Sequence, residues 1–426
     1  MNLFSNSKRL VPATIFVGVL VSFIFTSRGG FSTLTFGDSA DYLESARSVF
    51  SHEGFYRGES TWPFFRPPGY PFAIAFIWEL VGSESLAALK ILNLFLHLFS
   101  SFLVFKLASI RFNPRVSLII TSLYLFNPFS LIPLNEVQTE TITTFLFLSF
   151  ISLILARDTV FGLLALSFVS VFLIAVRPEY LIFLVLTIFC ILVFQPARRK
   201  YFIKILILTI SLVLCLSWWG FQNKKATGDF ILLTNAGSYF LWNGSTDLVL
   251  DNYTISLKPD PDYDLKTYNA LQKEIADLKS SWGKEFEESS LAQKSNYWFQ
   301  AYADNVKRDP PRYILKTLEK GIIFMRPFLN PRSHGLGVAI VSLFVLLPMT
   351  ASVGYATFLA AKRKIYDPIL GIMIIGFLSI MMVHMLQMPD QRYKMPIFVP
   401  LFAYSSGFVF YAIHQRKSNL KVNAKE

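Results

Sequence analysis

The chain alternates between long apolar runs and short polar segments. A helix that crosses a bilayer needs about 20 mostly apolar residues, and a series of runs approaches that length. The pattern therefore predicts an all-α polytopic membrane protein with about ten transmembrane helices. The predicted spans are 10–27, 86–108, 115–133, 138–156, 159–176, 179–195, 202–220, 336–359, 368–387 and 395–413.

The charges predict how these spans are oriented. Hydrophobic residues make up 53% of the chain and charged residues only 16%, against about 25% in soluble domains. Six short segments between spans hold 17 basic and three acidic residues, which more than accounts for the formal charge of +12. Under the positive-inside rule all six lie in the cytoplasm, as do both termini. No basic surplus remains that would indicate nucleic-acid binding. We read 10–27 as a retained first helix.

Two segments on the non-cytoplasmic side are long. The first, 28–85, contains two stretches that are too short to span, 38–51 and 70–82, which are typical of helices lying at the membrane interface. The second, 221–335, is nearly neutral and predicts a small soluble segment with helices at 265–280 and 289–307. The predicted organisation is a catalytic membrane core over 1–220, the soluble segment 221–335, and C-terminal helices with a basic tail over 336–426.

Charged side chains near the membrane are costly and therefore functional candidates. In the first loop these are Asp38, Asp41 and Arg66. Either carboxylate could act as a general base or metal ligand, or could simply favour the helix dipole at the start of 38–51. Arg66 stands before two prolines and could bind a phosphate through its planar guanidinium, or could only meet lipid headgroups.

Three further hairpins bring charges to the same side of the membrane. Glu136 and Glu140 stand four residues apart at the predicted start of 138–156, where they would share one helix face. Arg177 and Glu179 flank a proline between two spans. The last hairpin holds Asp390, Arg392, Tyr393 and Lys394. Each group has an ordinary interpretation, as dipole-favoured acids, an exposed pair at a helix break, or a polar turn. Their coincidence on one face favours a shared site.

Four ordered motifs carry a resemblance to a known family. They are Gly37-Asp38-Ser39-Ala40-Asp41-Tyr42, Arg66-Pro67-Pro68-Gly69-Tyr70-Pro71, Glu136-Val137-Gln138-Thr139-Glu140 and Arg392-Tyr393-Lys394-Met395-Pro396. In their order and position the chain resembles membrane glycosyltransferases of the C superfold, in the protein-mannosyltransferase-like and aminoarabinose-transferase-like group. The resemblance covers 1–180 well, the C-terminal helices moderately, and 221–335 hardly at all.

The resemblance implies a transferase that uses a polyprenyl-phosphate sugar as donor. Asp38, with Asp41 beside it, matches the acidic first loop that supplies the catalytic base. Arg66 and Arg392, with Arg177 and Lys394, would bind the donor phosphate. The remaining candidates, from the motifs and from the Arg177–Glu179 hairpin, would line the substrate site: Tyr42, Tyr70, Glu136, Glu140, Glu179 and Tyr393. The chain has fewer predicted spans than the family usually has. Its acidic pair is D-x-x-D rather than D-x-D, so no metal requirement carries over, although a divalent metal there stays open.

The functional hypothesis is an inverting glycosyltransferase. It would move a sugar from a polyprenyl-phosphate donor to a hydroxyl of a glycan, lipid or protein on the non-cytoplasmic face. A bacterial inner membrane is the expected location. One alternative is a lipid-linked oligosaccharide flippase or other transporter, which would need charges along a path through the bilayer. Another is a polysaccharide polymerase or ligase. A non-enzymatic scaffold stays open if the four charged groups do not converge.

Overall fold

The computed structural model describes residues 7–27, 30, 38–52, 66–194, 198–248 and 263–423. Within these ranges the chain is helical and has no strand, so the predicted all-α class is confirmed. Each of the ten predicted spans coincides with helix. The corresponding elements are α1 (Ser7–Ser27), α4 (Leu86–Arg111), α5 (Pro114–Leu125), α7 (Glu140–Leu155), α8 (Val160–Val176), α9 (Tyr180–Phe194), α10 (Arg198–Thr227), α17 (Leu336–Arg363), α18 (Pro368–Leu386) and α19 (Met395–Asn423).

Length and hydropathy support part of the predicted span count. Among the described residues, five helices are long and apolar enough to cross a bilayer, and a bent pair raises the number to six. Five more apolar helices have between 10 and 17 residues, which is shorter than a typical span. The chain is therefore a multi-pass helical membrane protein, and the count of ten remains a prediction.

The predicted span 115–133 is not one straight helix. It breaks after α5 into α6 (Pro128–Leu131) and the 3₁₀ turn η1 (Ile132–Asn135), with a bend of 62°. The cause lies in Asn127-Pro128. Asn127 is extended, as expected of a residue before proline, and its side chain accepts a hydrogen bond from Phe129 N at 3.0 Å. This starts a new helix in a new direction.

Both predicted interfacial helices are present. They are α2 (Asp38–Phe50) and α3 (Gly69–Val81), and α3 ends at Gly82 in the left-handed conformation. Gly69 packs directly on the end of α8, because a Cβ at this position would lie 2.6 Å from Val176 N. The lack of a side chain at Gly69 therefore lets α3 approach α8 closely. This close approach in turn fixes the position of Arg66, three residues earlier.

The soluble segment forms a small helical cap. It contains α11 (Gly237–Ser245), α13 (Tyr263–Glu288) and α14 (Leu291–Arg308), which match the two predicted helices and add one. Its core is an aromatic cluster of Trp242, Phe286 and Trp298. Helix α15 (Pro310–Met325) and the short α16 (Pro331–His334) lead from the cap to α17. The proposed division into three regions remains a prediction.

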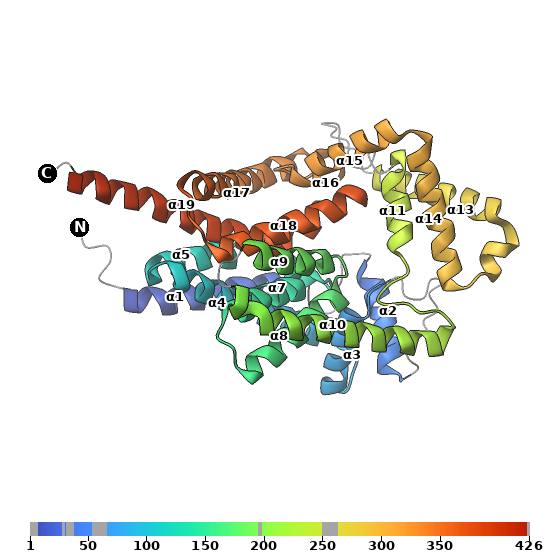
Figure 1. The fold of residues 1–426 in the computed structure, drawn as a ribbon, viewed down its shortest axis with the longest axis horizontal. Helices are drawn as coiled ribbons and strands as arrows, with labels where there is room; N and C mark the ends of the chain where they lie inside the picture. The colour runs from blue at the N-terminus through green and yellow to red at the C-terminus, as the bar shows by residue number, and fades with distance from the viewer. Residues whose placement is uncertain are drawn as a thin grey trace.

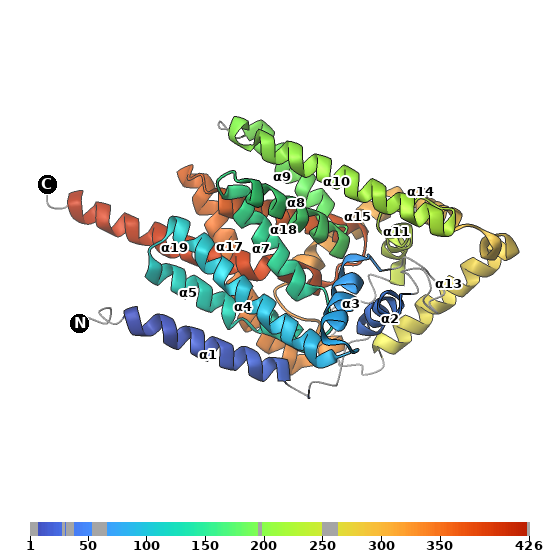
Figure 2. The same cartoon turned by 90° about the horizontal axis from the view of Figure 1, so that it is seen from below.

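The arrangement separates the termini from the cap. Both termini lie at one end of the molecule, whereas α11, α13 and α14 lie at the opposite end (Figures 1 and 2). The joint between cap and membrane helices is tight. The buried Lys320 of α15 donates hydrogen bonds to Gly244 O of α11 at 2.8 Å and Leu386 O of α18 at 3.1 Å. Cap and bundle thus meet just before the turn η2 (Gln391–Lys394).

Candidate active site

Arg66 joins the two acidic residues of the first loop. Its Nη2 lies 2.9 Å from Asp38 Oδ1 and 2.7 Å from Asp41 Oδ2, and its Nε donates to Asp41 Oδ2 at 3.1 Å. Asp38 and Asp41 both stand in the first turn of α2, three residues apart, so the favourable helix-dipole interaction exists beside the ion pairs. The guanidinium also lies 5.1 Å from the centre of the Tyr42 ring.

Arg392 brings the last hairpin to the same carboxylate. Its Nη2 donates to Asp38 Oδ2 and, at 3.1 Å, to the Tyr393 hydroxyl. Its Nε lies 3.5 Å from Asp390 and 3.9 Å from Glu140. Asp390 also accepts a hydrogen bond from Arg392 N at the start of η2, which fixes the backbone of the turn. Residues 354 positions apart in the sequence thus form one ion pair.

Glu140 continues the network into the membrane core. Its Oε1 accepts a hydrogen bond from Arg177 Nη2 at 2.9 Å, and Arg177 Nη1 lies 3.4 Å from Glu179. Arg177 Nε donates to the hydroxyl of Thr139 at 2.8 Å. The side chains of Arg177 and Glu140 are only 4% and 7% exposed. Buried charges of this kind require partners of opposite charge, and Arg177 and Glu140 are partners of each other.

The four hairpins therefore converge. An unbroken series of ion pairs runs from Asp41 through Arg66, Asp38, Arg392, Glu140 and Arg177 to Glu179. We call these seven residues the charge network. It contains three cations and four anions, so the described side chains nearly balance one another. Convergence favours a shared site over separate caps, turns and headgroup contacts.

The network sets the protonation state of the first loop. Burial raises the pKa of Asp38, but Arg392 and Arg66 outweigh it and hold that pKa below the ordinary value of 3.8. Burial lowers the pKa of Arg66, but Tyr42, Asp38 and Asp41 raise it by more, so the net shift of this pKa is upward. Burial raises the pKa of Tyr42 to about 12. At neutral pH Asp38 is thus a carboxylate, Arg66 a cation and Tyr42 a neutral phenol.

A cavity of about 700 Å³ borders the network. Glu140, Asp390 and Arg392 form one wall. The lining also includes apolar side chains, Phe129, Ile132, Pro133, Leu329, Val338 and Met395, and α13 of the cap contributes Tyr268 and Leu271. A pocket with a large apolar surface and a few charged groups is typical of sites for amphipathic ligands.

The cavity also contains residues that sequence analysis missed. Arg326, Asn330, His334 and Gln391 all line it, and Arg326 is buried with its Nε donating to Phe328 O at 3.2 Å. One signal was available in the sequence. Arg326 precedes a proline at a helix end, as Arg66 and Arg177 do. A proline after the arginine ends or redirects the helix, which leaves the guanidinium at the end of the element.

Two predicted site residues lie elsewhere. The expectation that Glu136 shares a helix face with Glu140 is wrong, because 132–135 form a 3₁₀ turn and α7 begins only at Glu140. Glu136 is extended, and its carbonyl accepts a hydrogen bond from Asn93 of α4. Lys394 is not among the described residues that line the cavity, and it donates to Phe324 O at 2.6 Å. It anchors the end of α15, a position that does not support phosphate binding.

The two predicted tyrosines beside the network have different surroundings. Tyr70 is buried, and its ring meets that of Tyr42 edge to face at 5.1 Å, so it supports the first loop. Tyr393 contacts both Arg392 and Arg177. Gly37 of the first motif lies outside the described residues.

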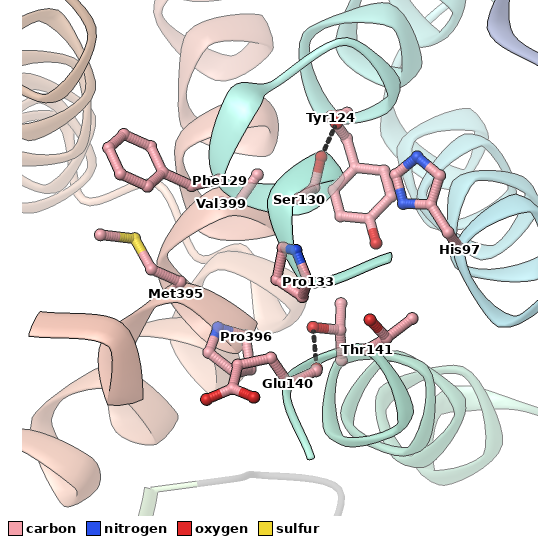
Figure 3. Close-up of a pocket in the computed structure, with 11 residues that line it drawn as sticks. His97, Tyr124, Phe129, Ser130, Pro133, Glu140, Thr141, Met395, Pro396 and Val399 are labelled. Carbon is pink, nitrogen blue, oxygen red and sulfur yellow. Dashed lines mark hydrogen bonds between the residues drawn. The ribbon is translucent and has the colours of Figure 1, made fainter. Parts of the chain in front are cut away.

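A second, small cavity lies beside Glu140. Its volume is about 10 Å³, close to the space that one water needs. Figure 3 shows His97 and Tyr124 on one side of it and Met395 and Pro396 on the other. The Glu140 carboxylate is turned away from His97 (Figure 3).

The carboxylates are arranged for arginines rather than as a preformed metal cage. Within the described ranges, no three His, Cys, Asp or Glu side chains gather in a way that could hold an ion. Asp38 and Asp41 instead share Arg66. A divalent metal at the first loop would have to compete with that guanidinium for both carboxylates.

Comparisons with known proteins identify the fold that contains this site. No protein-family model and no curated protein matches the chain. Solved structures do. The apo oligosaccharyltransferase of Archaeoglobus fulgidus matches with a TM-score of 0.53 and 13% identity over 99% of this chain and 53% of its own. The same enzyme, AglB, in complex with an inhibitory peptide and a dolichol-phosphate matches with 0.52 and 10% identity, over 98% and 52%.

A third structure is more distant. ArnT from Cupriavidus metallidurans bound to undecaprenyl phosphate matches with a TM-score of 0.43 and 12% identity, over 94% of this chain and 78% of its own. The chain spans about half the length of the oligosaccharyltransferase structures. The protein has the C-superfold (GT-C) architecture of membrane glycosyltransferases, as the four motifs predicted.

Proposed function

We propose that this protein is an integral-membrane inverting glycosyltransferase that takes its sugar from a polyprenyl-phosphate donor. The observation that carries the proposal is the charge network. In a GT-C fold, the first loop and the last hairpin deliver a carboxylate and two arginines to one point beside a cavity with apolar side chains in its wall. Apolar walls suit a polyprenyl chain and arginines suit a phosphate, which together describe the two parts of such a donor.

In the proposed mechanism the donor phosphate competes with Asp38 for Arg66 and Arg392. Both guanidiniums contact Asp38 in the described structure. When a phosphate binds between them, it replaces the carboxylate as their counter-ion. The two cations then stabilise the charge that develops on the phosphate as the glycosidic bond breaks. Arg177 is buried against Glu140 and Glu179, so its proposed role is to position the network rather than to contact the phosphate first.

Release from the two arginines turns Asp38 into a better base. As their influence weakens, the pKa of Asp38 rises toward its ordinary range, and the carboxylate can accept a proton. The acceptor hydroxyl attacks the anomeric carbon from the face opposite the phosphate, and its proton passes to Asp38. One C–O bond forms, the bond to the phosphate oxygen breaks, and the lipid phosphate leaves with the electron pair. A single displacement inverts the anomeric configuration.

The cap and the membrane orientation complete the proposal. Tyr268 and Leu271 of α13 reach the cavity, so the cap is placed to select the acceptor, whether a glycan, lipid or protein hydroxyl. One structure of AglB holds a dolichol-phosphate, which is consistent with a polyprenyl phosphate here. With the basic segments in the cytoplasm, the network faces the periplasm or exterior of a bacterial inner membrane.

The experiment that tests the proposal measures lipid phosphate release. Purified protein in nanodiscs is incubated with undecaprenyl-phosphate sugars and with a lipid-linked oligosaccharide, in the presence of acceptor glycans, lipids and peptides. Release of undecaprenyl phosphate with transfer of a single sugar supports the proposal. Release with transfer of an oligosaccharide indicates a polymerase or ligase. Movement of intact donor between leaflets without bond cleavage indicates a flippase and overturns the proposal.

A further inference from the structure

Three aromatic rings stack beside the charge network. His384 of α18 lies between Phe324 of α15 and Tyr393 of η2. The His384 ring is 5.6 Å from Phe324 with an interplanar angle of 7°, and 4.4 Å from Tyr393 with an angle of 13°. These three elements belong to separate parts of the C-terminal half. The imidazole therefore fixes where the Tyr393 ring can lie.

One hydrogen bond defines the state of His384. Its Nδ1 lies 2.8 Å from Met388 O, and because a carbonyl can only accept, Nδ1 carries a proton. Its Nε2 is buried without a hydrogen-bond partner. A second proton there would be an unsatisfied buried donor, which is costly. His384 is thus a neutral ring whose orientation is fixed by the stack on both faces and by the turn that leads to η2.

The Tyr393 ring contacts two arginines of the network. Arg392 and Arg177 each lie 4.9 Å from its centre. Its hydroxyl also accepts a hydrogen bond from Arg392 Nη2, the atom that contacts Asp38. The ring thus stands against two like-charged groups and attracts them electrostatically through its π face. A displaced ring would release Arg392 from its place beside Asp38.

We infer that His384 is a positioning residue that sets the two arginines through Tyr393. The inference deepens the proposed function and rests on it, because it assigns to His384 the placement of a guanidinium that binds the donor phosphate. His384 itself reaches neither Asp38 nor any arginine through a described hydrogen bond. Its effect passes through the ring of Tyr393.

The test compares two substitutions at this position. His384→Leu removes the stacking ring, whereas His384→Phe keeps a planar ring and loses only the hydrogen bond to Met388. We expect His384→Leu to raise the KM for undecaprenyl-phosphate sugar and the Kd for undecaprenyl phosphate about tenfold, and to lower kcat as well, because Arg392 also stabilises charge in the transition state. We expect His384→Phe to stay within about threefold of wild type in all three quantities.

A matched control separates positioning from loss of packing. Phe112 is a buried ring that also lies between two tyrosines, Tyr404 at 5.3 Å and Tyr411 at 5.8 Å, and it has no described contact with the network. Phe112→Leu should lower the thermal midpoint about as much as His384→Leu and leave KM and Kd unchanged. In a Tyr393→Leu background, His384→Leu should have no further effect on KM, because the path through the ring is already lost.

The outcomes distinguish this inference from the proposed function. If wild type transfers sugar and His384→Leu keeps the wild-type KM and Kd, the inference alone is overturned. The same holds if His384→Leu acts equally strongly in the Tyr393→Leu background. If wild type neither binds undecaprenyl phosphate nor transfers sugar, the proposed function fails and the inference fails with it.

Discussion

Substitution of Asp38 by Asn should lower both kcat and the KM for the donor. The amide has nearly the shape of the carboxylate but cannot accept a proton from the acceptor hydroxyl. A general base contributes about 10²- to 10⁴-fold to a rate, so kcat should fall by that factor, or about 3–5 kcal/mol in activation free energy. The loss should appear as a slow chemical step rather than as weak donor binding.

The KM for the donor should fall in the same variant. Asp38 occupies both Arg66 and Arg392 in the described structure. Its charge is absent in Asp38→Asn, so the donor phosphate no longer competes with a carboxylate. A charge-assisted hydrogen bond contributes about 1.5–3 kcal/mol. Because the competitor is partly exposed to water, we expect only part of that value, a decrease in KM of about threefold to tenfold.

The assay is steady-state release of undecaprenyl phosphate over a range of donor concentrations. Asp41→Asn is the matched control, because among the described residues Asp41 forms an ion pair with Arg66 alone, and its side chain is 48% exposed. Its kcat should stay within about tenfold of wild type, since it is not the assigned base. Full kcat in Asp38→Asn would refute Asp38 as the base. A raised KM together with a poorly folded protein would show that the carboxylate only holds the first loop in place.

Three further predictions concern the surroundings of the network. Despite burial, the arginines lower the pKa of Asp38 in the folded state, so the contribution of Asp38 to stability is present above pH 3.8 and is lost as the pH falls further. The difference in thermal midpoint between wild type and Asp38→Asn should therefore shrink from pH 6 to pH 3. A constant difference would count against the ion pairs. Gly69→Ala should destabilise by about 1–3 kcal/mol because its Cβ meets the backbone of α8, whereas Gly371→Ala, with open space around it, should not; equal melting curves would contradict the close approach. Arg177→Met should lower the free energy of unfolding by about 3–5 kcal/mol, because it leaves Glu140 buried without its partner. Adding Glu140→Gln should restore part of the lost stability in denaturation assays. No recovery in the double variant would show that the pair is not coupled.

Much of the fold could be predicted because apolar runs determine where membrane helices form. Helices α2 and α3 were also predictable, since their amphipathic or short apolar patterns end at clear signals such as Gly82. The positive-inside rule placed the charged hairpins on one side. That sidedness, rather than any single motif, is why Asp38, Arg66, Glu140 and Arg392 could be grouped before their contacts were known.

Other features depend on geometry that the pattern does not encode. The 3₁₀ turn after α6 separates Glu136 from the helix that Glu140 begins, and the four-residue spacing alone could not reveal it. Lys394 and Arg392 are two residues apart, yet η2 directs them to different neighbours. The role of Arg326 depends on how α15 returns from the cap, and 221–335 carries no motif from which that path follows.

The most direct test of the central claim is an experimental structure of the protein in nanodiscs with undecaprenyl phosphate. The account predicts a phosphate about 3 Å from the guanidiniums of both Arg66 and Arg392, with Asp38 separated from at least one of them and the polyprenyl chain along the apolar cavity wall. A lipid phosphate bound elsewhere, with both ion pairs of Asp38 intact, would contradict it.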